Sequence, residues 1–287
     1  MLSTSGMAPQ TKTTTEPDLR LVLPSRAENV ALVRRALSGV VDVLELGEDR
    51  SLDVNAAVSE ACNNVVVHAY EGTEGPMNVY LCIQPTELEV IVSDDGVGIR
   101  PNVPEPDLDI QGLGLSLIHA LTDRVEFLGG TGDGTKVRMS FAFDGDPDVV
   151  FDRDRADERE VRPPPGELSI AVSSGPFAAP VLGRTIAMLA ARAEFSLEGI
   201  SEAQLVTDTI AAHAPSLIVG SKIQLGIDRR QGQLVVRVGP FRDGGSTRII
   251  EASAVGDLPP LLERLTEQRR VESSADGELL CLVLGAH

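Results

Sequence analysis

Apolar positions along the chain follow two different spacings, which predict short strands and longer helices. Residues 19–23 alternate between apolar and polar, as a strand with one buried face does. Ser25, with Glu28 three residues later, has the pattern of a helix N-cap. Apolar residues then recur at helical spacing, which predicts a first helix over residues 27–46 and a second over residues 53–70.

The rest of the first half continues with shorter elements. We expect strands at 78–84 and 87–93 around a Pro85-Thr86 turn, an irregular Gly/Pro/Asp-rich stretch at 94–111, a helix at 112–123, and strands at 124–128 and 136–143. Helices that follow one another without regular strand alternation argue against a doubly wound sheet. The pattern predicts an α+β fold: a two-layer α/β sandwich with a mixed sheet and helices on one face.

The second half of the chain repeats this order. We expect strands at 168–172, 222–228, 233–238 and 279–284, and helices at 178–191, from Glu202 onward and at 261–267. The first of these strands matches residues 19–23 at an offset of 149. The expected organisation is a flexible tail at 1–17, a domain at 18–143, an acidic, Pro-ended linker at 144–165 and a degenerate second copy at 166–287. An unrelated α+β domain with the same element order is the alternative.

Charge and composition exclude several functions. Asp and Glu total 43 against 25 Lys and Arg, a formal net charge of −18, which argues against binding to nucleic acid or to an anionic membrane. The three cysteines, Cys62, Cys82 and Cys281, have no paired spacing, so we expect buried, reduced thiols. No apolar stretch approaches the ~20 residues of a membrane span, and the first 17 residues have no hydrophobic segment. These features favour a cytoplasmic protein.

The second predicted helix carries a carboxylate and an amide on one face. Glu60 and Asn64 are four residues apart, so their side chains are neighbours on the helix surface. A carboxylate can deprotonate a hydroxyl, and an amide oxygen can bind a hard cation. Taken alone, such a pair is more often just a solvated helix face.

Two glycine-containing segments follow. Asp94 ends a strand and precedes Gly96 and Gly98; its carboxylate can accept a hydrogen bond from an exocyclic amine, and the glycines permit close approach of a ligand. Gly112 and Gly114 open a helix whose free N–H groups favour a phosphate.

A further hydroxyl stands at the start of the last strand of the first half. Thr135, directly after a glycine, can lie beside the same ligand or can simply be a strand threonine. Each of these segments is ordinary by itself, and a plain turn is the slightly favoured explanation of the Asp94 segment taken alone.

The order of these motifs resembles the Bergerat-fold (GHKL) ATPases. Within that superfamily, residues 58–70 and 112–125 resemble the bacterial anti-sigma factor serine/threonine kinases of the sporulation and general-stress switches. The resemblance covers residues 18–143. It implies an ATP-binding domain that requires Mg²⁺.

The resemblance also implies a role for each matching residue. Glu60 would be the general base and Asn64 the Mg²⁺ ligand. Asp94 would bind the adenine amine. The remaining nucleotide contacts would come from Gly96, Gly98, Gly112, Gly114, Leu115 and Thr135, and Arg34 matches a position that contacts sigma factor.

The function implied is that of an ATP-dependent kinase that phosphorylates a STAS-type anti-anti-sigma protein and sequesters a sigma factor, as a homodimer or an internal pseudo-dimer. The alternative is a non-catalytic, nucleotide-gated binding module for partner switching. A histidine kinase needs a phospho-acceptor His followed by an acidic residue, whereas His68, His119 and His213 each precede Ala. We expect His68 to pack under the hairpin.

Two departures from the family pattern affect this expectation. The segment between Gly98 and Gly112 offers no cation beyond Arg100 to reach a γ-phosphate, which predicts slow turnover or tight nucleotide retention. In the second copy, Asp208, Ala212 and Pro240 stand in place of Glu60, Asn64 and Asp94. The second copy is therefore predicted not to bind ATP.

Overall fold

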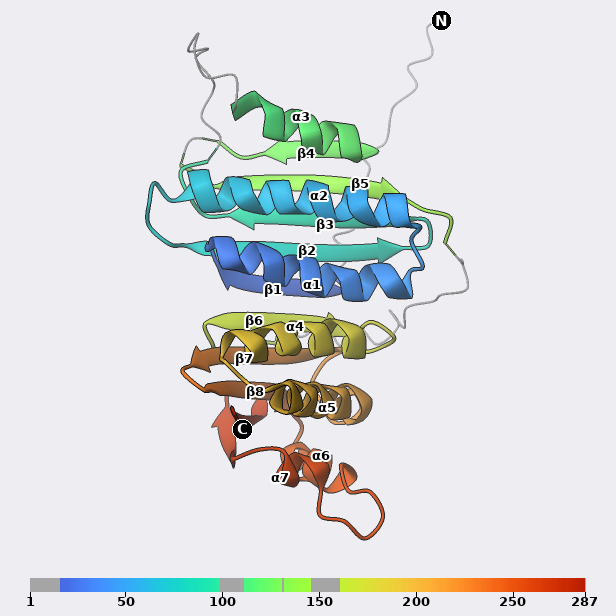
Figure 1. Ribbon diagram of the computed structural model, residues 1–287, viewed down its shortest axis with the longest axis vertical. Coiled ribbons are helices and arrows are strands. Elements are labelled where there is room, and N and C mark those ends of the chain that lie inside the picture. The colour runs from blue at the N-terminus through green and yellow to red at the C-terminus, as the bar shows by residue number, and fades with distance from the viewer. Residues whose placement is uncertain (1–15, 99–110, 131, 146–160, 287) are drawn as a thin grey trace, which may run out of the picture.

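A single ten-stranded sheet, covered by helices on one face, runs through the whole molecule (Figure 1). The structure is a computed structural model that describes residues 16–98, 111–130, 132–145 and 161–286. The strand order is β4-β5-β3-β2-β1-β6-β7-β8-β10-β9. This two-layer α+β architecture is the one predicted from the sequence, but the expected mixed sheet is wrong: every strand pair of the described sheet is antiparallel.

The first half forms one end of the sheet and three of its covering helices. Its elements are β1 (Leu19–Pro24), α1 (Ala27–Val43), α2 (Glu48–Asn64), the π-helical turn η1 (Val65–Ala69), β2 (Pro76–Gln84), β3 (Glu87–Asp94), α3 (Gln111–Leu121), β4 (Arg124–Leu128) and β5 (Thr135–Ala142).

The second half forms the other end of the sheet. Its elements are β6 (Leu168–Ser173), α4 (Ala178–Arg192), α5 (Leu197–His213), the 3₁₀ turn η3 (Ala214–Ser216), β7 (Lys222–Arg230), β8 (Gln233–Phe241), α6 (Gly245–Ala252), α7 (Leu261–Arg264), β9 (Gln268–Ser274) and β10 (Gly277–Gly285).

The strand order reads the same outward from the centre in both directions. On one side of the β1–β6 pair lie β2, β3, β5 and β4; on the other lie β7, β8, β10 and β9. β1 and β6 pair antiparallel, with Leu19 opposite Val172 and Leu21 opposite Ile170. Each half places its first strand at the centre and its last hairpin at the outer edge.

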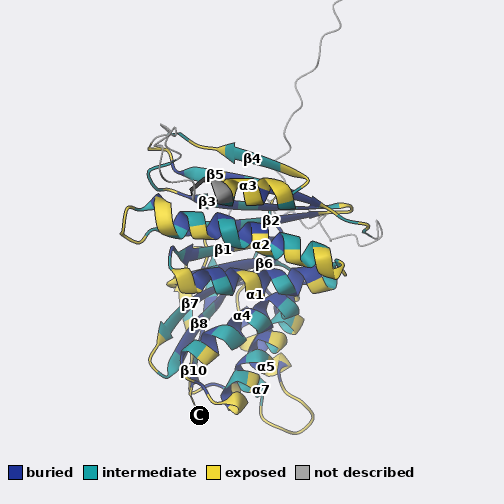
Figure 2. Ribbon diagram, turned by 45° about the horizontal axis from the view of Figure 1, so that its top comes forward, coloured by how far each residue is buried: buried dark blue, intermediate teal, exposed yellow. Residues whose placement is uncertain are grey.

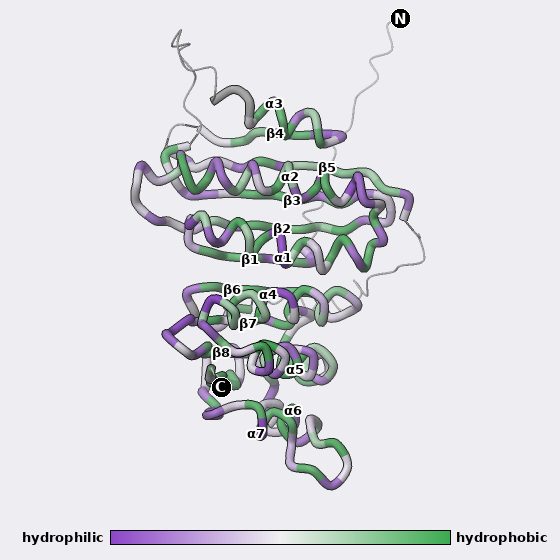
Figure 3. The backbone as a smooth tube through the Cα atoms, in the orientation of Figure 1, coloured by the Kyte–Doolittle hydropathy of each residue, from purple (hydrophilic) through white to green (hydrophobic). Residues whose placement is uncertain are grey.

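The core lies between the sheet and the helices. Leu19, Leu21 and Leu23 of β1 are buried and face the helices, while Arg20 between them is exposed. The helices bury the stripe that faces the sheet and expose the outer side (Figure 2). Hydrophobic residues follow the central strands (Figure 3). The period-2 pattern of the strands therefore decides which side chains reach the helix layer.

Helix α2 differs from its prediction at both ends. It begins at Glu48, not at residue 53, and its regular hydrogen bonding ends at Asn64, after which Val65–Ala69 form a π-helical turn.

The first helix, α1, ends at Val43, because Glu45 adopts a positive φ of 51°. The predicted cap at Ser25 is wrong: the N-cap residue is Arg26, and the Ser25 hydroxyl accepts the Gly75 N–H instead.

The second half contains two elements that the sequence pattern did not predict. Helix α6 follows β8, and β9 pairs with β10 as an edge strand. β9 is almost entirely exposed and has only one large apolar residue, Val271, so it lacks the alternation that marks a strand with a buried face. Helix α5 begins at Leu197, ahead of the expected Glu202, because the Ser196 hydroxyl caps it by accepting the Gly199 N–H.

The two halves contact each other through helices as well as strands. Helices α1 and α4 pack closely: a Cβ atom on Gly39 would lie 2.9 Å from the backbone carbonyl carbon of Pro180. Arg184 of α4 hydrogen-bonds to Ser38 and forms an ion pair with Asp42, both on α1. Backbone pairing, close helix packing and charged contacts all join the two halves.

Among the helices of the described ranges, none is long and apolar enough to span a bilayer.

Candidate functional site

The C-terminal end of α2 and the first turn of α3 meet at Glu60. Glu60 and Asn64 are both half-buried on α2. A Cβ atom placed on Gly114 would lie 2.2 Å from Glu60 Oε1, so a larger residue at this position would displace the end of the Glu60 side chain. Gly114 therefore allows α3 to approach the predicted general base.

Asp94 lies at the end of β3, in the buried layer. The strand buries Leu88, Val90 and Val92 on its helix-facing side, and Asp94 continues this alternation with only 5% of its surface exposed. Burial therefore follows from the strand period, even though the side chain is a carboxylate.

Backbone amides hold the Asp94 carboxylate in place. Its Oδ1 accepts the N–H of Gly96 at 2.9 Å and that of Thr135 at 3.3 Å. Burial raises the pKa of Asp94 above its usual value, and the hydrogen bonds from Gly96 and Thr135 oppose this shift. Thr135 stands opposite Asp94 in the β3–β5 pair. The structure thus brings Asp94, Gly96 and Thr135 together, as predicted.

The two glycines after Asp94 are required by the protein's own backbone. A Cβ atom on Gly96 would lie 2.1 Å from the Ala69 carbonyl oxygen. One on Gly98, which has a positive φ of 76°, would lie 1.9 Å from the Gly130 oxygen. The sequence suggested that these glycines admit a ligand, whereas their nearest neighbours here are η1 and the Gly129–Gly134 loop. Their direct contact with a nucleotide remains a prediction.

The described residues fit a nucleotide and a metal ion at one end of the first half. Gly112 and Gly114 lie in the first turn of α3, where unpaired N–H groups attract phosphate. Asn64 offers a neutral oxygen, which suits Mg²⁺ bound largely through phosphates. Among the described residues no group of three or more His, Cys, Asp or Glu could hold a metal by itself.

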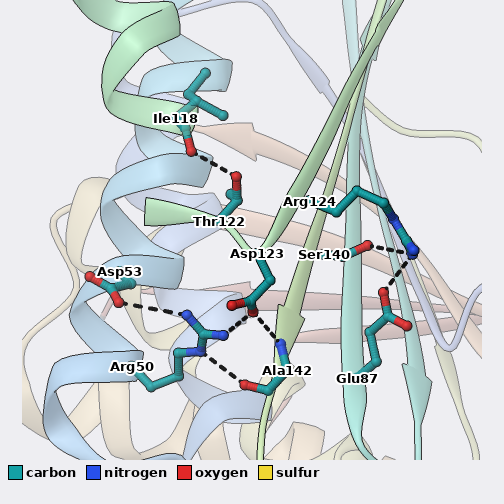
Figure 4. Close-up of polar contacts among 9 residues, drawn as sticks. All are labelled: Arg50, Asp53, Glu87, Ile118, Thr122, Asp123, Arg124, Ser140 and Ala142. Atoms are coloured by element: carbon teal, nitrogen blue, oxygen red, sulfur yellow. Dashed lines mark hydrogen bonds and ion pairs between the residues drawn. The ribbon is translucent and has the colours of Figure 1, made fainter. Parts of the chain in front are cut away.

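A polar network at the opposite end of α2 fixes the two helices that frame this site (Figure 4). Arg50 donates to the Ala142 carbonyl at 3.0 Å and forms an ion pair with Asp123, which follows α3. Asp123 in turn accepts the Ala142 N–H at 2.7 Å. Arg124 pairs with Glu87 at 2.8 Å. Helix α2, the α3–β4 connection and the edge of the sheet are thereby tied together.

Several other predicted residues can be placed. Leu115 is exposed on α3 and Arg34 is exposed on α1. His68 is exposed, so its predicted packing under the hairpin is wrong: the π-helical turn directs it outward. The three cysteines are buried, as expected, and burial raises the pKa of Cys62 to about 12. Arg100 lies outside the described residues.

Comparison with known proteins assigns a family to this geometry. The histidine kinase-like ATPase domain matches residues 23–141. A serine-protein kinase RsbW from Bacillus mycoides is 32% identical over 122 residues, which cover 38% of this chain and 76% of the relative. The RsbW protein from Bacillus thuringiensis is 31% identical over the same shares of the two chains. The chain belongs to the RsbW family.

The match to the histidine kinase-like ATPase domain ends at residue 141, within β5, so it covers the first half alone. Among solved structures, the RsbU and RsbW domains of a Mycobacterium tuberculosis protein share 20% identity over 42% of this chain and 32% of theirs, with a TM-score of 0.34. A histidine kinase domain from Erythrobacter litoralis shares 20% identity over 40% of this chain and 59% of its own, with a TM-score of 0.28.

The sequence patterns did not predict that Tyr70 lies beside the site. Tyr70 follows η1, and its hydroxyl accepts the Asp95 N–H at 3.0 Å. The only signal in the sequence was a rare aromatic residue at a helix end, in a chain with two tyrosines. Spacing alone could not bring it to the end of β3.

Proposed function

We propose that the chain is an ATP-dependent serine/threonine protein kinase that acts as an anti-sigma regulatory factor. Its substrate would be a STAS-type anti-anti-sigma protein, and its second binding partner a sigma factor, contacted in part through Arg34 on α1. The observation that supports the proposal is the approach of Gly114 to the Glu60 carboxylate, since a carboxylate there could act as a general base next to a helix terminus that would favour phosphate.

The residues would act as follows. Glu60 would accept the proton of the substrate hydroxyl as the serine oxygen attacks the γ-phosphorus. Asn64 would hold Mg²⁺, and the buried Asp94 carboxylate would accept a hydrogen bond from the adenine amine. Bound ATP would supply the γ-phosphoryl group, whose transfer to the serine oxygen breaks its bond to the bridging oxygen and leaves ADP.

The second half would be a degenerate copy that binds no ATP and completes an internal pseudo-dimer. The matching strand order supports this. The β2–β3 and β7–β8 hairpins each have a two-residue turn. Asp94 is the eighth residue of β3 and Pro240 is the eighth residue of β8, so the two occupy corresponding positions. Proline offers no carboxylate for adenine. β6 occupies the free edge of β1, where a second chain would otherwise pair.

A phosphotransfer assay tests the kinase. The full chain, Mg²⁺ and ATP labelled at the γ-phosphate would be incubated with STAS proteins from the same genome. Glu60→Gln should lower transfer roughly 10²- to 10⁴-fold while ATP binding is retained. Asp208→Asn, the matched change in the second half, should leave transfer unchanged. Transfer that survives in Glu60→Gln would contradict the assigned base.

The nucleotide-gated binding module is the second candidate, because the sequence between Gly98 and Gly112 contains no Lys or Arg beyond Arg100 to stabilise a transferred phosphoryl group. It predicts that the wild-type chain binds ATP and that ATP alters partner binding, with no label reaching any protein. The same assay, read alongside partner pull-down with ATP and ADP, distinguishes the two.

A further inference from the structure

The hydroxyl of Tyr70 joins two segments that flank Asp94. It donates to the carbonyl oxygen of Pro76 at 2.5 Å and accepts the N–H of Asp95 at 3.0 Å. Pro76 opens β2, and Asp95 directly follows the last residue of β3. Because Met77 pairs with Asp94 in the sheet, the hydroxyl closes the end of the β2–β3 ladder beside the predicted adenine acceptor.

The Tyr70 ring packs against the backbone of Gly75, which fixes its position. A Cβ atom on Gly75 would lie 2.2 Å from the ring, so the ring rests directly on the Gly75 backbone. That backbone is held by Ser25, which accepts the Gly75 N–H through its hydroxyl at 3.1 Å and donates its own N–H to the Gly75 carbonyl at 2.9 Å. The direction of the Tyr70 hydroxyl is therefore set by its surroundings.

The turn that follows Asp94 is anchored on both sides. Tyr70 holds the Asp95 amide, and the Ala69 carbonyl accepts the Val97 N–H at 2.9 Å. Between these two anchors, the Gly96 N–H donates to the Asp94 carboxylate. Adjacent residues at the end of η1 thus hold the backbone whose amide orients the carboxylate.

We propose that Tyr70 is a positioning residue for base recognition: it fixes the Asp95 amide and so aims the Asp94 carboxylate at an adenine amine. The inference deepens the proposed ATP site and rests on it. Loss of the hydroxyl leaves the Asp95 N–H without this acceptor and loosens the turn. The loss should therefore weaken recognition of the base and leave binding of the phosphates intact.

The test compares two tyrosine variants of the full chain. Tyr70→Phe removes the hydroxyl and keeps the ring. Tyr80→Phe is the matched control, because Tyr80 lies on β2 with its ring beneath Arg20, on the sheet face away from the helices. Affinities for ADP and GDP would be measured by calorimetry with Mg²⁺ present. Tyr70→Phe should weaken ADP binding roughly three- to tenfold, leave GDP binding unchanged and so lower the ADP:GDP preference, whereas Tyr80→Phe should match wild type.

An optical measurement keeps the inference testable if Tyr70→Phe folds poorly. The chain has no tryptophan and two tyrosines, so emission from Tyr80→Phe comes from Tyr70 alone. Saturating ADP should change that emission. Unchanged emission, an unaltered ADP:GDP preference in Tyr70→Phe, or equal losses for both nucleotides would overturn the positioning role. A wild-type chain that binds no ADP would overturn the proposed function itself.

Discussion

The two halves share a strand order but place a hydrogen-bonded carboxylate on different strands. In the first half Asp94 lies on β3, and its carboxylate accepts the amides of Gly96 and Thr135. In the second half Glu278 lies on β10, opposite Phe241 of β8, and its carboxylate accepts the amides of Gly244 and Ser246.

The difference concerns how each half uses the N-terminus of a helix. Gly244 and Ser246 lie at the start of α6, so Glu278 occupies the amides that could otherwise attract an anion. In the first half the first turn of α3 approaches the Glu60 carboxylate, since a Cβ atom on Gly114 would lie 2.2 Å from Glu60 Oε1. If α3 binds phosphate as proposed, one half uses a helix terminus for a ligand, whereas the other half caps a helix terminus with its own acidic side chain.

The largest expected effect concerns adenine recognition. Asp94→Asn should weaken ATP binding roughly 10- to 100-fold, because a hydrogen bond to a charged group is worth about 1.5–3 kcal/mol. Calorimetry on the full chain measures both the affinity and the number of sites, which should be one per chain. Pro240→Ala, at the corresponding position of β8, is the control and should bind ATP as wild type does. A second site that persists in Asp94→Asn would mean that the second half binds nucleotide.

The next effect concerns the joint between the halves. Gly39→Leu should force α1 and α4 apart, because even a Cβ atom would lie 2.9 Å from the Pro180 backbone. Overpacking of this kind costs about 1–3 kcal/mol of unfolding free energy. Denaturant titration followed by circular dichroism measures it. Gly47→Ser is the control, since nothing lies within 4 Å of a Cβ atom there. An unchanged midpoint for Gly39→Leu would show that the helices do not pack this closely.

The smallest effect concerns the Glu278 cap. The amides of Gly244 and Ser246 lower the pKa of Glu278, so its stabilisation is complete above the unfolded-state pKa and is lost as pH falls through the lower folded-state value. Glu278→Gln should lower the free energy of unfolding by about 0.5–1 kcal/mol at neutral pH. It should also reduce the decrease in that free energy as the solution becomes acidic. Thermal melting across pH measures both.

The control for this variant is Glu251→Gln, which changes an exposed carboxylate of the same helix and should leave the pH profile unaltered. Asp94 provides a contrast of opposite sign: burial raises its pKa, so ionisation of Asp94 lowers the free energy of unfolding as pH rises through that region. If both carboxylates shifted stability in the same direction, the comparison of the two halves would fail.

Local patterns predicted much of the fold and of the site. Alternation placed the hairpin of β2 and β3, and helical spacing placed α1 and α4. The same alternation explains why Asp94 is buried, and the four-residue spacing explains why Glu60 and Asn64 share a face. The patterns failed for α6 and β9, because a short helix and an exposed edge strand bury too little to leave a periodic signal.

The sequence alone determined most of the helix–strand order and the faces that are buried, and it predicted the residues that would handle a phosphoryl group, because each depends on neighbours within a few positions. Only the tertiary structure decided that β1 pairs with β6, that Gly114 meets Glu60, that Ser25 holds Gly75 and that Tyr70 reaches Asp95. These contacts join backbone segments far apart along the chain. They are fixed by packing and by hydrogen bonds that no local spacing encodes.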